Sequence, residues 1–223
     1  MLREACSSYK LILGIAGRVG TGKSTCRAWL AARGAVAVDC DKLGHAVYAP
    51  EGPAYAAVAA LFPSAVTSPG GPIDRGKLGA LVFSDAAAMS ALNAAVWPAL
   101  RGMVVRALNE EAAARGAGAG SLVGVVEAAI LLEAGWGTSM DGVWLLEAPR
   151  EALLVRLQGR GLEGAAAEAR VSAQPSAQER LEGPFGASVT RVINTGGALE
   201  ETQAQYAAAW EGLLAKAIGE GKA

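Results

Sequence analysis

The chain has 223 residues, of which 52% are hydrophobic and 18% are charged. Twenty basic residues against 21 acidic ones leave a net charge of −1, which excludes a protein that coats nucleic acid through bulk positive charge. The length predicts one compact domain, and the hydrophobic fraction excludes a disordered polymer.

The three cysteines and the single histidine are too few for a disulfide framework or a zinc cluster. No apolar run approaches the roughly 18 residues of a transmembrane helix, and the N-terminal segment lacks the apolar core of a signal peptide. We therefore expect a cytoplasmic protein whose partners include neither a membrane nor a nucleic acid.

Near the N-terminus, two apolar segments at 10–15 and 35–38 read as buried strands. Between them the apolar residues from Ser24 onward fall at helical spacing, and Gly34 ends that helix. A strand, a helix and a second strand within about thirty residues form a βαβ unit with parallel strands.

The middle third is predicted to be helical. A short helix covers 53–62, and a loop rich in proline and glycine follows at 64–73. Asp74 and Ser84 read as the N-caps of two further helices. Pro98 should end or kink the second of them.

The last third returns to alternation of strands and helices. We predict strands at 121–126, 142–146 and 189–194, a helix from Pro149 to Leu157, a charged and exposed helical flap at 159–184, and a closing helix at 198–218. The whole pattern predicts an α/β three-layer domain built on five parallel strands.

The segment Gly17–Ser24 fits the phosphate-binding pattern G-x-x-x-x-G-K-S/T at every fixed position. It follows a predicted strand and opens a predicted helix, which weighs against an accidental glycine-rich turn. Such a loop points its backbone amides at phosphate oxygens, Lys23 reaches the β- and γ-phosphates, and the Ser24 hydroxyl is a ligand for Mg²⁺. Lys23 is expected to be an exposed loop residue that contributes little packing.

Asp39 and Asp41 stand where the second predicted strand ends, at the sheet edge where ligands bind in α/β folds. A carboxylate there can accept the proton of an acceptor hydroxyl during phosphoryl transfer, and we favour Asp41 for this role. The alternative is that both aspartates cap the following helix, which suits Asp39 better. No Asn-Lys-x-Asp tetrapeptide occurs, so a guanine-specific switch is not indicated, and a small-molecule kinase fits better.

Beyond these motifs, the chain resembles the dephospho-coenzyme A kinases over nearly its whole length. The resembling positions are 17–25, 38–45, 50–55, 73–75, Leu78, 82–83, 92–93, 97–98, 127–136 and 192–194. The Asp-Lys-Leu-Gly-His, Trp-Pro and Leu-Leu-Glu-Ala-Gly-Trp sequences within them look like the kinase half of the eukaryotic bifunctional coenzyme A synthase.

The resemblance implies an adenylate-kinase-like P-loop kinase that uses ATP and Mg²⁺. Its activity would be phosphorylation of the ribose 3′-hydroxyl of dephospho-coenzyme A, the last step of coenzyme A synthesis, with dephospho-coenzyme A as its small-molecule partner. The implied parts are a core at about 10–50, 121–158 and 185–223, a helical coenzyme-A-binding region at about 51–115, and a lid at about 159–184.

The resemblance also implies roles for individual residues. The catalytic set is Asp41, Lys23, Arg160 and Arg170; the ATP loop is Gly17, Arg18, Val19, Gly20, Thr21, Gly22, Lys23, Ser24 and Thr25. His45 and Arg75 join Asp41 in binding the acceptor, although a surface histidine and an arginine that only holds the helical region are the alternatives. Ser24 and Glu127 would hold Mg²⁺, with a plain strand-end acid as the alternative for Glu127.

Some positions leave questions open. Arg160-Gly161 stands where the family has Arg-Asp at the start of the lid, Glu127 replaces an aspartate, and Gln174 matches a lid glutamine to which we assign no role. Glu133 is expected to make a structural pairing. A kinase of another small alcohol or of a nucleoside monophosphate, and a nucleotide-binding protein that has lost transfer, remain the rival functions.

Overall fold

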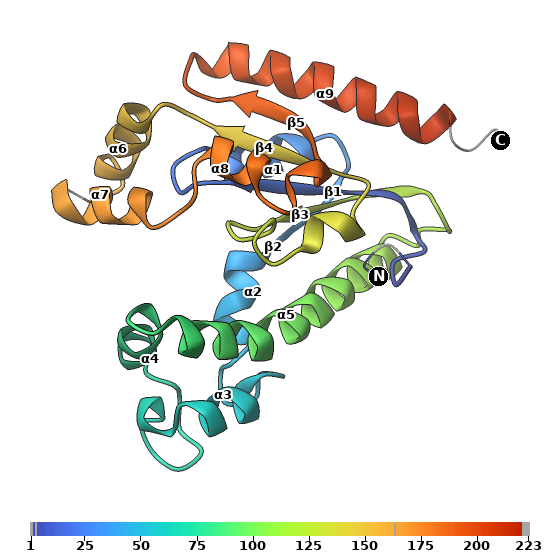
Figure 1. Ribbon diagram of the computed structural model, residues 1–223. Coiled ribbons are helices and arrows are strands. Elements are labelled where there is room, and N and C mark those ends of the chain that lie inside the picture. The colour runs from blue at the N-terminus through green and yellow to red at the C-terminus, as the bar shows by residue number, and fades with distance from the viewer. Residues whose placement is uncertain (1, 3, 163, 220–223) are drawn as a thin grey trace. The chain divides into compact units, whose positions relative to one another are not determined.

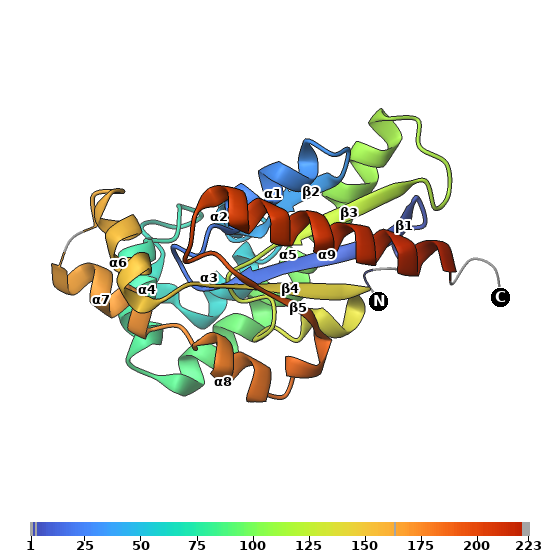
Figure 2. The same cartoon turned by 90° about the horizontal axis from the view of Figure 1, so that it is seen from above.

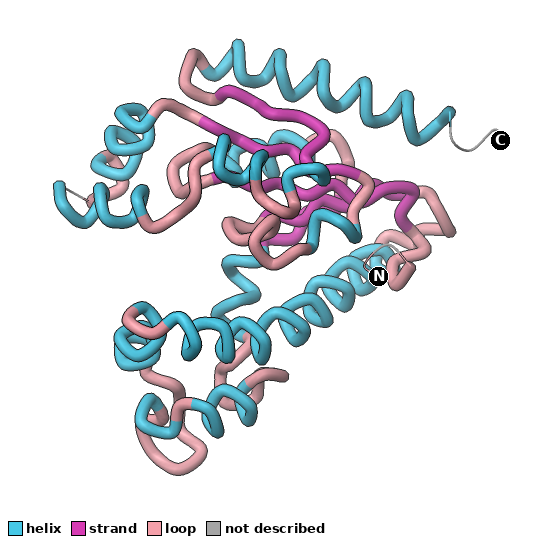
Figure 3. Tube along the Cα trace, in the orientation of Figure 1, coloured by secondary structure: helices cyan, strands magenta, loops and turns pink. Residues whose placement is uncertain are grey.

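The computed structural model describes residue 2, residues 4–162 and residues 164–219. Its five strands form a single sheet, seen edge-on in Figure 1 and coloured magenta in Figure 3. In the sheet order they are β2 (Val36–Asp39), β3 (Leu122–Glu127), β1 (Tyr9–Gly17), β4 (Gly142–Glu147) and β5 (Val189–Asn194). The pairs β1–β3, β1–β4 and β4–β5 are parallel, so the predicted five-stranded parallel core is confirmed.

The helices alternate with these strands along the chain. They are α1 (Lys23–Ala31), α2 (Cys40–Ala46), α3 (Tyr55–Leu61), α4 (Arg75–Phe83), α5 (Ala86–Ala114), α6 (Arg150–Gln158), α7 (Gly164–Ser172), α8 (Ala177–Glu182) and α9 (Leu199–Gly219). Short 3₁₀ turns occupy 63–65, 136–139 and 186–188. Within the described ranges, no helix combines the length and the apolar character needed to cross a bilayer.

The chain divides into two compact units. One runs up to Val38 and resumes at Leu108, and the other spans 39–107. The first unit contains the strands, apart from the last residue of β2, together with α1 and α6 to α9. The last four residues of the core segment predicted at 185–223 lie outside the described residues.

One face of the sheet is covered by α1 and α9, which Figure 2 shows lying over the strands. Alternate residues of β1 and β3 point to this face, as the two-residue period of a strand requires. They pack on Trp29 of α1 and Tyr206 of α9, whose ring centres lie 5.6 Å apart. Trp144 of β4 stacks on the same tyrosine. The packing of α1 and α9 holds the strands in place, and the loops that could bind a ligand begin at the ends of these strands.

The central position of β1 determines where a ligand can bind. In the register of the sheet, Ile15 lies opposite Glu127 of β3, and Gly17 lies opposite Leu146 of β4. The loop after β1 therefore emerges between the carboxyl ends of two neighbouring strands. Such edges carry the ligand sites of open α/β sheets.

Helix starts in the second unit match the prediction only in part. Asp74 caps α4 by accepting a hydrogen bond from the Lys77 amide, as predicted. The prediction for Ser84 is wrong, because Ser84 ends α4. The carboxylate of Asp85 accepts hydrogen bonds from backbone amides in the first turn of α5 and so stabilises its start.

Pro98 does not end a helix. α5 continues through it for 29 residues, from Ala86 to Ala114. Proline removes one backbone donor, and the remaining turns of a long helix can still form on both sides of it. Of the predicted ending or kink, the ending is therefore wrong, and the kink stays a prediction.

The predicted flap at 159–184 does contain two helices, α7 and α8, and their helical character is confirmed. Its exposure was overestimated. α6 and α7 share a small apolar core, against which Val19 of the phosphate-binding loop packs, made of Leu153, Leu157, Ala167 and Val171. Arg180 of α8 is only 5% exposed, because it pairs with a carboxylate far away in sequence.

Candidate active site

The loop from Gly17 to Ser24 joins β1 to α1, as the motif requires. Gly20 and Gly22 have φ values of 84° and 82°, a left-handed conformation that residues with a side chain rarely adopt. α1 begins at Lys23 directly after Gly22. The loop thus places backbone amides and the positive end of a helix dipole around one point, which is a site for an anion.

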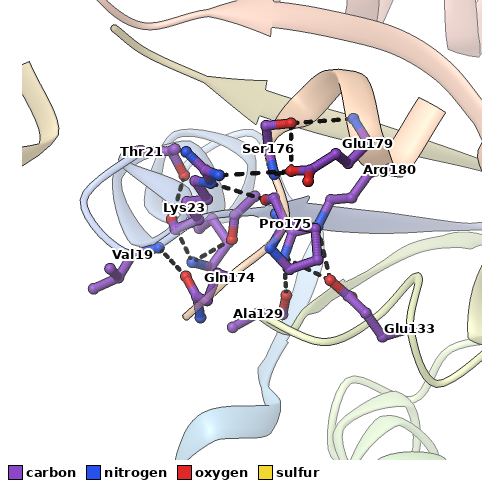
Figure 4. A network of polar contacts seen from close by, with 12 residues as sticks. Val19, Thr21, Lys23, Ala129, Glu133, Gln174, Pro175, Ser176, Glu179 and Arg180 are labelled. Atoms are coloured by element: carbon purple, nitrogen blue, oxygen red, sulfur yellow. Dashed lines mark hydrogen bonds and ion pairs between the residues drawn. The ribbon is translucent and has the colours of Figure 1, made fainter. Parts of the chain in front are cut away.

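The ammonium group of Lys23 lies inside this loop. Its Nζ donates hydrogen bonds to the carbonyl oxygens of Gly17, at 3.0 Å, and Arg18, at 3.1 Å. The residue is 8% exposed, so the prediction of an exposed lysine is wrong. The loop curls around its own lysine, which holds a positive charge at the point where the amides converge (Figure 4).

Arg156 supports the loop from α6. Its guanidinium donates to the Gly20 carbonyl oxygen at 3.1 Å and to the hydroxyl oxygen of Thr195, which follows β5. The Thr195 hydroxyl lies 3.0 Å from the Thr21 carbonyl oxygen. The sequence analysis missed Arg156, which lies in the last turn of α6 four positions before Arg160; the clustering of two arginines at the end of this helix was the signal that could have shown it.

A cavity of about 260 Å³ adjoins this support. It is lined by residues that include Gly22, Thr25, Arg156, Arg160, Gly197 and Tyr206. Two arginines, an aromatic ring and the first turn of α1 suit a flat, polar group attached to phosphates.

The two predicted lid cations differ in position. Arg160 lines the cavity next to the loop. Arg170 is exposed in the last turn of α7 and does not line the cavity. The described structure therefore brings the first of them to the loop and not the second.

The segment after α7 contacts the other side of the loop (Figure 4). The Val19 amide donates to Gln174 Oε1 at 2.7 Å, and Arg18 Nε donates to the Pro175 carbonyl oxygen at 2.9 Å. Arg18 also lies 3.9 Å from a carboxylate oxygen of Glu179. Hydrogen bonds from Ser176 lower the pKa of the Glu179 carboxyl, and burial lowers the pKa of the Arg18 guanidinium.

Arg180 anchors the same segment to the loop after β3. Its guanidinium lies 2.8 Å from Glu133 Oε1 and donates to the Ala129 carbonyl oxygen at 3.1 Å (Figure 4). The expected structural pairing of Glu133 is confirmed. The pair joins the buried guanidinium of α8 to a partly exposed carboxylate of the loop after β3.

Glu127 ends β3, opposite β1, and its Oε2 accepts a hydrogen bond from Arg27 Nε at 2.6 Å. It is 5% exposed, whereas Ser24 is exposed in the first turn of α1. The described residues contain no group of three or more histidine, cysteine or acidic side chains that could hold a metal. A magnesium ion at this point would take most of its ligands from phosphate and water, as Mg²⁺ commonly does, so these two residues suit it.

The second unit carries the candidate acceptor residues. Asp39 ends β2 and accepts a hydrogen bond from the Lys42 amide at 3.2 Å, so it caps α2 as expected. Asp41 is exposed in the first turn of α2. Its carboxylate is therefore accessible to a ligand.

His45 and Arg75 lie in the same unit. His45 is exposed in the last turn of α2, one helical turn after Asp41. Arg75 begins α4, and its guanidinium carbon lies 5.6 Å from the ring centre of Tyr48. This contact supports the reading of Arg75 as a residue that holds the helical region together.

Comparison with known proteins agrees with this geometry. The dephospho-CoA kinase family model (CoaE) matches residues 11–195. The dephospho-CoA kinase of Moorella thermoacetica is 39% identical over 203 residues, covering 91% of this chain and 92% of that protein. The dephospho-CoA kinase of Frankia casuarinae is 38% identical over 204 residues, covering 92% of this chain and 84% of that protein.

Solved structures show the same fold. The crystal structure of TT1252 from Thermus thermophilus superimposes with a TM-score of 0.69 at 32% identity, covering 93% of this chain and 98% of that one. Dephospho-CoA kinase from Campylobacter jejuni gives a TM-score of 0.58 at 19% identity, covering 95% of this chain and 98% of that one. With a matching phosphate loop, a matching family model and these relatives, the chain belongs to the dephospho-CoA kinase family.

Proposed function

We propose that this protein transfers the γ-phosphoryl group of ATP to the ribose 3′-hydroxyl of dephospho-CoA, which yields CoA and ADP. The observation that carries the proposal is the phosphate loop of this chain, which encloses the Lys23 ammonium group. The chain's membership of the family supports it. Such a loop provides amides and a cation for a triphosphate, and membership of the family supplies the acceptor.

In the proposed reaction the 3′-oxygen forms a bond to the γ-phosphorus while the bond to the β,γ-bridging oxygen breaks. Asp41 accepts the proton of the hydroxyl, and ADP leaves with the electron pair of the broken bond. Lys23 stabilises the negative charge that spreads over the transferred group, and Arg160 and Arg170 join it once the lid closes over ATP. Positioning and charge stabilisation account for most of the rate in this type of transfer.

Magnesium, when bound, would neutralise charge on the β- and γ-phosphates. We assign Ser24 as its direct protein ligand and Glu127 as a contact through water, because Glu127 already accepts a short hydrogen bond from Arg27. The adenine of ATP is assigned to the cavity beside Gly22 and Thr25, where Arg156 and Tyr206 provide a polar and an aromatic wall.

The acceptor site is proposed in the helical region at about 51–115, together with Asp41, His45 and Arg75. The segment at about 159–184 is proposed as the lid, and the remaining parts as the core. Excluding water matters because water would otherwise take the phosphoryl group. We also propose that the enzyme acts in the cytoplasm, where its ATP is available.

A finer proposal concerns the subtype. The Trp97-Pro98 pair and the sequence at 41–45 resemble the kinase half of eukaryotic CoA synthase, whereas the relatives reported above are bacterial. A phylogenetic tree of family members with Trp-Pro and with His-Pro at this position tests it. Placement of this chain among the His-Pro sequences would overturn the subtype and leave the activity unaffected.

The activity is tested by offering the purified protein γ-labelled ATP with a panel of acceptors. Dephospho-CoA should become labelled, and a nucleoside monophosphate and other small alcohols should not. Label on another acceptor alone would support the rival small-molecule kinase. Tight ATP binding without any labelled product would support a nucleotide-binding protein that has lost transfer.

A further inference from the structure

The orientation of the Gln174 side chain is determined by the phosphate loop. The Val19 amide is a hydrogen-bond donor, and it lies 2.7 Å from one end of the glutamine amide. Only the oxygen of that amide can accept, so Oε1 occupies this end and the NH₂ group occupies the other. Gln174 therefore presents a donor, Nε2, next to the loop.

The contact between Gln174 and Val19 is stabilised by the neighbours of both residues. Val19 packs against the apolar core shared by α6 and α7. The neighbouring Arg18 donates from Nε to the Pro175 carbonyl oxygen at 2.9 Å, so two consecutive residues of each segment are joined. Arg180 fixes the continuation of the segment through its ion pair with Glu133. Gln174 is thus positioned by the loop itself.

The Nε2 group of Gln174 is available for a ligand. The side chain is half-buried, and among the described residues its side-chain hydrogen bond is the one that its oxygen accepts from Val19. A neutral NH₂ donor beside a phosphate loop suits a phosphoryl oxygen, because hydrogen bonds to charged acceptors are stronger than those between neutral groups.

The geometry also indicates which phosphate it meets. The cavity assigned to the adenine is lined by Gly20, Gly22 and Thr25, the part of the loop that leads into α1, and Gln174 does not line it. Gln174 contacts Val19, on the part of the loop nearer β1. A triphosphate that starts at the cavity and follows the loop therefore ends at Gln174.

We propose that Gln174 is a phosphoryl-binding residue whose Nε2 donates a hydrogen bond to the γ-phosphoryl group of ATP. The inference rests on the proposed function for the presence of ATP, and adds a role for a residue to which the sequence alone gave none. Gln174 would distinguish ATP from ADP and remain in contact with the group during transfer.

The test uses Gln174→Glu, which keeps an oxygen for the Val19 amide and replaces the donor by a second acceptor. The dissociation constants of ADP and of a non-hydrolysable ATP analogue are measured by calorimetry without any acceptor. We expect the analogue to bind at least about tenfold more weakly than to the wild type, and ADP to change by less than about threefold. A residue that only shapes the loop would change both affinities by the same factor.

The matched control is Gln203→Glu, which adds the same charge at an exposed position of α9 that does not line the cavity beside the loop. It should leave both affinities unchanged. If Gln174→Glu does not fold, Gln174→Ala removes donor and acceptor together and should still weaken the analogue about tenfold more than ADP. Equal losses for both nucleotides, or no loss, would overturn the proposal.

This measurement is independent of the acceptor. If the wild type binds both nucleotides but does not phosphorylate dephospho-CoA, the proposed function fails while the role of Gln174 can still be tested. If the wild type phosphorylates dephospho-CoA and the variant loses both affinities equally, the role of Gln174 fails alone.

Discussion

Lys23→Met separates the two roles that the structure gives to Lys23. The ammonium now donates to two carbonyl oxygens of its own loop, Gly17 at 3.0 Å and Arg18 at 3.1 Å. When a triphosphate binds, the same charge can face phosphate oxygens. Methionine keeps an unbranched side chain of similar length in this buried position and removes only the donor and the charge.

The stability cost can be estimated from these contacts. The Arg18 carbonyl oxygen keeps two other donors, the amide and the hydroxyl of Thr21. The loss is therefore closer to one charged hydrogen bond than to two, about 2 kcal/mol. For a chain of this size such a loss lowers Tm by about 4–8 °C and leaves the protein folded at assay temperature.

The cost to catalysis should be larger. Removal of one preorganised positive donor from a phosphoryl-transfer site lowers kcat by about 10²- to 10³-fold. Turnover is followed by ADP release in a coupled assay, with circular dichroism to verify the fold. Turnover within tenfold of the wild type in a folded Lys23→Met protein would refute the role of the ammonium at the centre of the loop.

Three further outcomes are expected. Asp41→Asn should lower kcat by about 10²-fold or more and change the KM for ATP less than threefold; an effect confined to that KM would show that this carboxylate is not the base. Arg180→Met should lower the free energy of unfolding in urea by about 2 kcal/mol or more, because it leaves Glu133 without its buried partner. The double variant with Arg180→Met and Glu133→Met should recover part of this loss. An equal loss in the single and the double variant would contradict the pairing. The pKa of Glu179 lies below its ordinary value of 4.5 because of hydrogen bonds from Ser176, so its stabilising effect is present above that value and is lost as the pH falls through the lower, folded-state pKa. Glu179→Gln should accordingly be less stable than the wild type at neutral pH and equal to it once the carboxyl is protonated, and thermal melts that keep the same difference in acid would contradict this.

The sequence predicted β1 to β4 because their apolar residues form short segments next to glycine or charged residues, whereas β5 mixes apolar residues with Thr190 and Arg191 and is largely exposed. It predicted the phosphate loop because Gly17–Ser24 carries its chemistry within eight consecutive residues. It could not predict the strand order, since that depends on pairing between segments far apart in the chain. The caps show the limit at short range, where the adjacent Ser84 and Asp85 are equally good candidates and packing decides between them.

The charged residues show the limit at long range. Arg160, Arg170 and Arg180 look alike in the sequence of the flap. The described structure places Arg160 at the cavity, leaves Arg170 exposed, and pairs Arg180 with Glu133, which lies 47 positions earlier. Such pairings arise from the fold and leave no local pattern. For the same reason the contact between Gln174 and the phosphate loop could not be predicted.

The most direct test of the account is a crystal structure with ADP and dephospho-CoA bound. We predict the β-phosphate of ADP within the loop of residues 17–25, next to Lys23, and the ribose 3′-hydroxyl of dephospho-CoA within hydrogen-bond distance of Asp41. A complex in which the 3′-hydroxyl faces away from both Asp41 and the phosphate would contradict the account.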